Sequence, residues 1–165
     1  MPRNDSDSVV TQCLIDRLID KDPQVRNDQP LARSQSVKQL KLSLKRDLEW
    51  LLNSRRIAEP APESFAEVSR SLYHFGLPDF SALSVESPRD RNSLLREIEA
   101  AVAAFEPRLQ SVRVTLVDSP SKLIRAVRFQ IEGMLMMDPA PEQISFDTVL
   151  QLGNGEFQIK GERSA

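Results

Sequence analysis

Glu106, Pro107 and Arg108 form the most distinctive charged motif of this sequence. A helical pattern ends there, because a residue that precedes proline is disfavoured in the α region. In extended backbone, side chains two residues apart point to the same side, so a carboxylate acceptor lies next to a guanidinium donor. Such a pair could tie the helix to the following segment internally, or it could be held out as a clamp for a protein partner.

Other residues with catalytic potential are scarce. The sequence has one histidine, His74, and one cysteine, Cys13, without a nucleophile motif or paired metal-ligand spacing. The five glycines form no phosphate-binding loop. Two of the 24 acidic residues could hydrolyse a glycosidic bond, but no pattern singles out a pair. The sequence therefore predicts a protein that is not an enzyme and has no cofactor or metal.

The composition describes a globular chain that is not built for nucleic acid. Of its 165 residues, 40% are hydrophobic and 28% are charged, and the net charge of −2 does not attract polyanions. No run approaches the roughly 18 apolar residues of a membrane span. The polar start MPRNDSDS lacks the apolar segment of a signal peptide. These features, with a lone cysteine, predict a cytoplasmic protein without direct membrane insertion.

Residues 1–35 are expected to stand apart from a domain formed by residues 36–165. Residues 9–20 predict a short amphipathic helix with Val10, Leu14 and Leu18 on one side, followed by a flexible linker. This helix either folds back on the domain or docks on a partner, so Leu14 and Leu18 are candidate partner-binding residues. Removing residues 1–35 is expected to leave a folded domain.

Helical spacing of apolar residues predicts three further helices. The first follows Ser36 as N-cap, the second follows Ser64 and ends near Gly76, and the third follows the sequence SPRD and ends before Pro107. Their apolar positions are Val37, Leu40, Leu44, Leu48 and Leu51; Phe65, Val68 and Leu72; and Leu94 or Leu95, Ile98, Val102 and Phe105.

The first of these helices also has a basic face. Its cations are Lys38, Lys41, Lys45 and Arg46, with Arg55 and Arg56 just beyond. This face could bind phosphate groups. Because aromatic residues are few and the rest of the chain is acidic, the pattern favours a solvated or protein-facing surface instead.

After Pro107 the apolar period changes from 3.6 to 2. Alternation predicts strands near residues 112–116, 127–132, 144–150 and 156–160, joined by turns at 118–122, 137–143 and 153–155. Helices followed by hairpin-linked strands predict an α+β fold, with N-terminal helices packed on one face of a small antiparallel β-sheet. The last strand is the candidate edge strand, with Phe157 and Ile159 as candidate partner-binding residues.

Several motifs occur together in an order that is typical of one family. They are LEWLLNSRR (48–56), SLYHFGLPDFS (71–81), FEPRL (105–109) and ISFDTVLQLGNGEFQI (144–159), preceded by CLIDRL (13–18). Over residues 9–160 the chain resembles TssE, a baseplate subunit of the type VI secretion system, which is similar to the small wedge protein of contractile phage baseplates. It departs from the family at LYHFG (72–76), where VLNYG is more common.

The resemblance implies a structural role at a baseplate docked to the inner membrane. It implies TssF and TssG as partners in the wedge, TssK as a further candidate, and the sheath subunits TssB and TssC. For these the domain would be a first template, held by added strands at a sheet edge. In the family the Glu-Pro-Arg motif is associated with the wedge core. This association favours the clamp and makes Glu106, Pro107 and Arg108 candidate partner-binding residues.

Two alternatives stay open. Related phage proteins have carried a lysozyme-like label, so a peptidoglycan hydrolase is one of them. The other is an anti-adaptor of the same fold, which shields the stationary-phase sigma factor by binding its delivery protein. The FEPRL and LIDRL segments favour the baseplate interpretation over the anti-adaptor.

Overall fold

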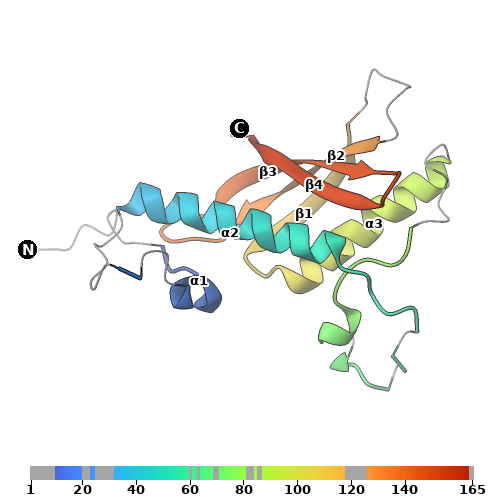
Figure 1. Cartoon of the computed structure of the whole chain (residues 1–165), viewed down its shortest axis with the longest axis horizontal. Helices are drawn as coiled ribbons and strands as arrows, with labels where there is room; N and C mark the ends of the chain where they lie inside the picture. The colour runs from blue at the N-terminus through green and yellow to red at the C-terminus, as the bar shows by residue number, and fades with distance from the viewer. Residues whose placement is uncertain are drawn as a thin grey trace, which may run out of the picture.

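The computed structural model describes residues 10–19, 23–24, 32–59, 61–62, 64–68, 71–80, 84, 87–117 and 126–163. The predicted α+β class is confirmed, because helices precede a four-stranded antiparallel sheet of order β1-β2-β3-β4 (Figure 1). The elements are α1 (Leu14–Leu18), α2 (Arg33–Asn53), the 3-10 helix η3 (Leu72–His74), α3 (Pro88–Phe105), β1 (Leu109–Leu116), β2 (Ala126–Leu135), β3 (Glu142–Gln151) and β4 (Glu156–Arg163). The predicted turn at 118–122 and linker residues 25–31 lie outside the described residues.

α2 begins earlier than predicted. Its N-cap is Ala32, and the backbone N–H of Ala32 donates to Oε1 of Gln35 at 3.2 Å. Ser36, the expected cap, lies inside the helix and is buried; its hydroxyl donates to the Arg33 carbonyl at 2.8 Å and accepts from the Val10 N–H at 3.2 Å. The polar side chain of Ser36 therefore serves a tertiary contact rather than a cap.

The second predicted helix is wrong. Among the described residues of this region, Ala66 and Glu67 lie in turns, and Val68 and Leu72–His74 have 3-10 rather than α-helical geometry. Phe65 is 59% exposed and Leu72 is 83% exposed, so these apolar residues have no core to pack on. A helix that short is unstable without such packing, whatever its apolar spacing.

Gly76 lies where the chain passes back beside the C-terminal end of α2. The Leu77 N–H donates to the Ser54 carbonyl at 2.9 Å, and the Arg56 N–H donates to the Leu77 carbonyl at 2.8 Å. Gly76 has φ +99°, and a Cβ there would lie 2.4 Å from the Ser54 carbonyl oxygen. Only glycine fits at this crossing, which in turn fixes the position of Phe75.

The core lies between the sheet and the helices α2 and α3 (Figure 1). α3 packs beside β1, and α2 packs beside β4. Alternate side chains of the strands face this core, as the period of two predicts. Its largest fully buried members are Phe129, Phe146, Phe157, Leu44, Leu48, Leu52, Leu77, Ile98, Ile131, Leu135, Ile144 and Val102. The other face of the sheet is polar and carries exposed residues such as Arg128 and Lys160.

Helix side chains cover backbone groups on both edge strands. On β4, the Phe157 N–H donates to Oδ1 of Asn53 and the Phe157 carbonyl accepts from Nδ2 of Asn53, both at 2.9 Å. The Ile159 N–H donates to Oε1 of Glu49 at 3.0 Å. On β1, one N–H donates to Glu99 at 2.7 Å. These bonds occupy groups that could otherwise pair with another strand.

The N-terminal segment folds back on α2. Val10 is only 8% exposed, and Nε2 of Gln12 donates to the Ser36 carbonyl at 2.7 Å. The helix α1 is shorter than the predicted 9–20, and Leu14 and Leu18 on it are 68% and 74% exposed. Whether residues 36–165 fold without this segment stays a prediction.

Candidate partner-binding site at the Glu-Pro-Arg junction

The backbone of the Glu-Pro-Arg junction is anchored on both sides. The Glu106 N–H donates to the Val102 carbonyl at 2.9 Å, which closes the last turn of α3. The Leu109 N–H donates to the Glu106 carbonyl at 3.1 Å, and the Arg108 carbonyl accepts from the Met136 N–H at 2.8 Å. Pro107 adds its own restriction of φ. The motif is therefore a fixed corner between α3 and the sheet.

Arg108 holds the Glu106 carboxylate with two side-chain donors. Nε donates to Oε1 at 2.7 Å and Nη2 donates to Oε2 at 2.5 Å, while the Arg108 backbone N–H donates to Oε1 at 3.2 Å. The guanidinium also reaches α2, where Nη2 donates to Oδ2 of Asp47 at 2.6 Å and Nη1 donates to the Ser43 hydroxyl at 3.4 Å. The pair therefore ties the junction to α2 as well as to itself.

The ionic network continues from Asp47 to the N-terminal segment. Oδ1 of Asp47 accepts from Nε and Nη2 of Arg46 at 2.9 and 2.8 Å. Nη1 of Arg46 donates to Oδ1 of Asp16 at 2.7 Å, and the Cys13 thiol donates to Oδ2 of Asp16 at 2.7 Å. The Arg46 guanidinium also lies over the Trp50 ring, 5.1 Å from its centroid. Three segments far apart in sequence thus meet in one chain of charges.

Burial and pairing act together on the charged groups of this network. Glu106 is 5% exposed, and a carboxylate so deep is tolerated because it is paired. Hydrogen bonds to Glu106 raise the pKa of Arg108; burial opposes this effect, and Asp47 reinforces it. Burial raises the pKa of Asp16, but the hydrogen bonds from Cys13 and Arg46 lower it by more, so it lies below its ordinary value. These shifts favour the charged forms of Asp16 and Arg108.

An apolar cleft of about 590 Å³ lies directly beside the network. Its walls come from the N-terminal segment, α2, the loop around Phe75, and the Glu-Pro-Arg junction. Phe75 and Phe105 form one wall, with their rings edge to face at 5.3 Å. Trp50 on α2 is 58% exposed. The remaining apolar lining residues are Ile15, Leu48, Leu51 and Pro107. An apolar cleft with a charged border suits a protein segment that inserts an apolar side chain.

The structure separates the predicted site residues into three groups. Glu106, Pro107 and Arg108 line the cleft. Leu14 and Leu18 are exposed on α1 but do not line it, whereas the neighbouring Ile15 does.

The third group belongs to β4. The strand is at a sheet edge, as predicted. The side chains of Phe157 and Ile159, however, are each only 2% exposed and belong to the core. A partner could reach this part of β4 only through its backbone, whose N–H groups already bind Asn53 and Glu49. For all seven candidate residues, the role in partner binding stays a prediction.

Sequence reasoning missed the residues that complete the site. Asp47, the partner of Arg108, is 61 residues away in sequence, and Asp16 is 30 residues from Arg46, so no local spacing reveals either pair. Trp50 could have been found from the sequence. It is the single tryptophan of the chain and follows Arg46 of the basic face by one helical turn, so the two side chains are expected to lie next to each other.

The described part of the chain offers neither a metal site nor a membrane-spanning helix. Across these residues, no three or more His, Cys, Asp or Glu side chains gather in a way that could hold a metal ion. None of the described helices combines the length and the apolar character that a bilayer crossing requires.

Comparison with known proteins gives one family. Residues 38–140 match the model of the family described as baseplate wedge protein gp25, a range that includes most of α2, all of α3, β1 and β2, and the Glu-Pro-Arg junction. Neither the curated proteins nor the solved structures gave a significant match. The matched range is more than half of the chain. The chain therefore belongs to the gp25 family of baseplate wedge proteins, the family of TssE-like subunits, and its role is that of a structural baseplate component.

Proposed function

We propose that this chain is a non-enzymatic connector in the baseplate of a type VI secretion system. It assembles in the cytoplasm with TssF and TssG, with TssK as a further candidate, and it links the wedge to the sheath subunits TssB and TssC. The observation that carries this proposal is the fixed Glu-Pro-Arg corner beside an apolar cleft. The family match, whose range includes this corner, supports a baseplate role for the chain.

In the proposed complex the charge network positions the site, and the cleft binds the partner. Glu106 is too deeply buried and too fully bonded to reach out, so it acts by holding Arg108. The side chains of Arg108 and Arg46 are 22% and 31% exposed and present guanidinium edges at the rim. Trp50 offers an exposed aromatic surface, and tryptophan and arginine are the residue types that most often dominate interface energies. The Glu106–Arg108 ion pair is therefore an internal contact that also holds the partner-binding surface in place.

In this proposal a sheath subunit adds a strand at β4, where backbone groups of β4 exchange their present hydrogen-bond partners for those of the incoming strand. The N–H groups of Phe157 and Ile159 are bonded to Asn53 and Glu49, so an incoming strand must replace these side chains. Such an exchange trades one set of hydrogen bonds for another, which keeps the edge closed until the sheath subunit arrives.

A hydrolase function has no support from the same residues. The buried Glu106 accepts three N–H donors of Arg108, which suits a carboxylate rather than the protonated carboxylic acid that must protonate a glycosidic oxygen. Activity in a peptidoglycan-clearing assay would overturn the non-enzymatic part of the proposal.

The decisive experiment is co-purification with TssF and TssG. Trp50→Ala removes an exposed wall of the cleft, so we expect it to melt like the wild type and to lose the complex. Leu72→Ala is the matched control, because Leu72 is 83% exposed and does not line the cleft. A Trp50→Ala variant that keeps the complex would place the partner contact elsewhere. Failure of the wild type to bind would reject the assigned partners.

A further inference from the structure

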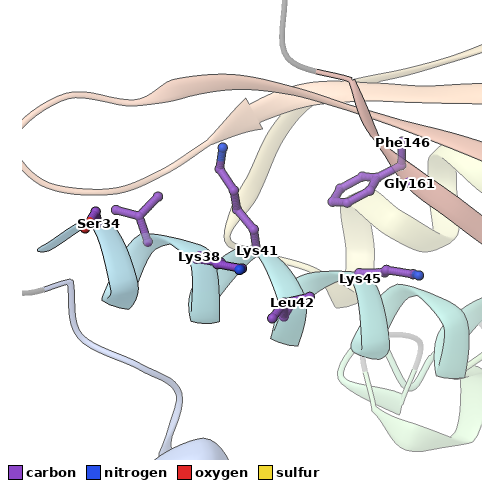
Figure 2. A pocket seen from close by; sticks show the side chains of 8 residues that line it. Ser34, Lys38, Lys41, Leu42, Lys45, Phe146 and Gly161 are labelled. Atoms are coloured by element: carbon purple, nitrogen blue, oxygen red, sulfur yellow. The ribbon is translucent and has the colours of Figure 1, made fainter. Parts of the chain in front are cut away.

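A second hollow, here called the lysine groove, lies between α2 and the strands β3 and β4 (Figure 2). Its volume is about 440 Å³. α2 contributes Ser34, Val37, Lys38, Lys41, Leu42 and Lys45, and the sheet contributes Phe146 and Gly161. None of these residues lines the cleft at the Glu-Pro-Arg junction, so the two hollows are separate.

The lysine groove carries more positive than negative charge. Nζ of Lys41 donates to Oε1 of Glu142 at 2.7 Å, so this lysine is part of an ion pair. Nζ of Lys45 is 4.0 Å from Oε1 of Glu49, whose Oε1 already accepts the Ile159 N–H. Lys38 is exposed and has no ion pair among the described residues. In a chain of net charge −2, this local excess of cations sets the groove apart.

The groove also has an apolar lining and a strand at its border. Phe146 is 1% exposed and forms its floor, Val37 packs against the core, and Leu42 on the wall is 56% exposed. Gly161 adds no side chain, and a Cβ there would meet no atom within 4 Å. This end of β4 lies beyond the irregularity at Asp147/Thr148, past the positions that bind Asn53 and Glu49.

The geometry points to an extended, acidic peptide segment of a protein partner as the ligand of the lysine groove. Its carboxylates would lie against Lys38 and Lys45, and its alternate apolar side chains would face Leu42 and the floor. An extended segment suits the site because side chains alternate along a strand, so one face can be acidic and the other apolar. The inference does not depend on the baseplate partners.

A nucleic acid would present the same negative charge but fits the groove less well. Binding of single strands relies on aromatic side chains on which bases stack. The aromatic side chain that lines the groove, Phe146, is buried beneath it. The apolar walls would also be left without a partner under a phosphate backbone. Charge complementarity and apolar lining together therefore favour a peptide.

The test is a titration of the full chain into fluorescent peptides, followed by anisotropy. The probe is an octapeptide that alternates aspartate and valine; one comparison peptide alternates lysine and valine, and another contains aspartate alone. We expect the aspartate–valine peptide to bind most tightly and to be weakened by salt, because exposed charges are screened. Equal binding of the all-aspartate peptide would show that the apolar lining plays no part, and would overturn the inference.

Charge reversal locates the binding on the molecule. Lys38→Glu with Lys45→Glu should weaken peptide binding by about tenfold or more, which corresponds to roughly 1.4 kcal/mol. Arg89→Glu with Arg96→Glu is the matched control: it changes the same charge at the same seven-residue spacing on α3, outside the groove. Both variants are checked by thermal melting.

Three results would overturn the inference. They are no binding of the aspartate–valine peptide by the wild type, equal weakening by the two charge-reversal variants, and tighter binding of a single-stranded DNA oligonucleotide that displaces the peptide. The last would make the groove a nucleic-acid site.

Discussion

The two hollows beside α2 use the cations of this helix in opposite ways. At the Glu-Pro-Arg cleft, Arg46 meets Asp47 and Asp16 in a network that also holds Arg108. In the lysine groove, Lys38 and Lys45 have weak carboxylate partners or none among the described residues. The basic face seen in the sequence is therefore two surfaces. The residue types fit this division, because a guanidinium makes several fixed hydrogen bonds, whereas a lysine acts as a mobile point charge.

Arg108→Met should give the largest effect on stability. It keeps an apolar stem of similar length but leaves the buried Glu106 carboxylate without its main partner, which costs about 3–5 kcal/mol of unfolding free energy. Lys38→Met in the lysine groove should change stability by no more than about 0.5 kcal/mol, as expected at an exposed position. Urea unfolding of both variants measures the contrast, and equal effects would abolish the distinction between the two hollows.

Gly76→Ala should have the next largest effect and should act at the cleft alone. The added Cβ would lie 2.4 Å from the Ser54 carbonyl oxygen at a residue with φ +99°, which costs about 1–3 kcal/mol in strain. Gly153→Ala is the control, because nothing lies within 4 Å of its added Cβ. Thermal melting gives the stability, and peptide binding at the lysine groove should be unchanged. Loss of that binding would show that the two sites are coupled.

Asn53→Ala tests the contact of α2 with the edge of β4. It removes two hydrogen bonds with the Phe157 backbone, so a loss of about 1–2 kcal/mol is expected. Because the variant also frees an edge N–H and C=O, sedimentation should show more self-association than in the wild type. Asn92→Ala on the exposed side of α3 is the control. A variant that self-associates no more than the wild type would contradict the protective role given to Asn53.

Asp16→Asn should have the smallest effect, limited to a defined pH range. The folded pKa of Asp16 is lower than the ordinary 3.8, so its charge stabilises the folded chain above 3.8 and this contribution is lost as the pH falls through the folded pKa. The wild type should therefore melt above the variant at neutral pH, and the two melting temperatures should converge in acid. A difference that persists in acid would show that Asp16 acts through packing instead of charge.

Much of the fold follows from local patterns in the sequence. The apolar stripes of α2 and α3, the stop before Pro107, the change of period and the turn at 153–155 all depend on neighbours within a few residues. Local spacing failed at Ser64, where the expected helix had nothing to pack against, and at Ser36, whose hydroxyl is used by Val10. These two errors share a cause, since in each a tertiary contact or its absence outweighed local preference.

The sequence by itself determined the α+β class, the Glu-Pro-Arg corner and the resemblance to a baseplate family. The tertiary structure alone decided which charges are paired and which are presented. Asp47 meets Arg108 from 61 residues away, and Asn53 meets Phe157 from 104 residues away. The physical reason is that a charge or an edge amide is satisfied by whatever lies within about 3 Å of it in space. The packing of the helices on the sheet sets that distance, and it cannot be read from the number of residues between the two partners.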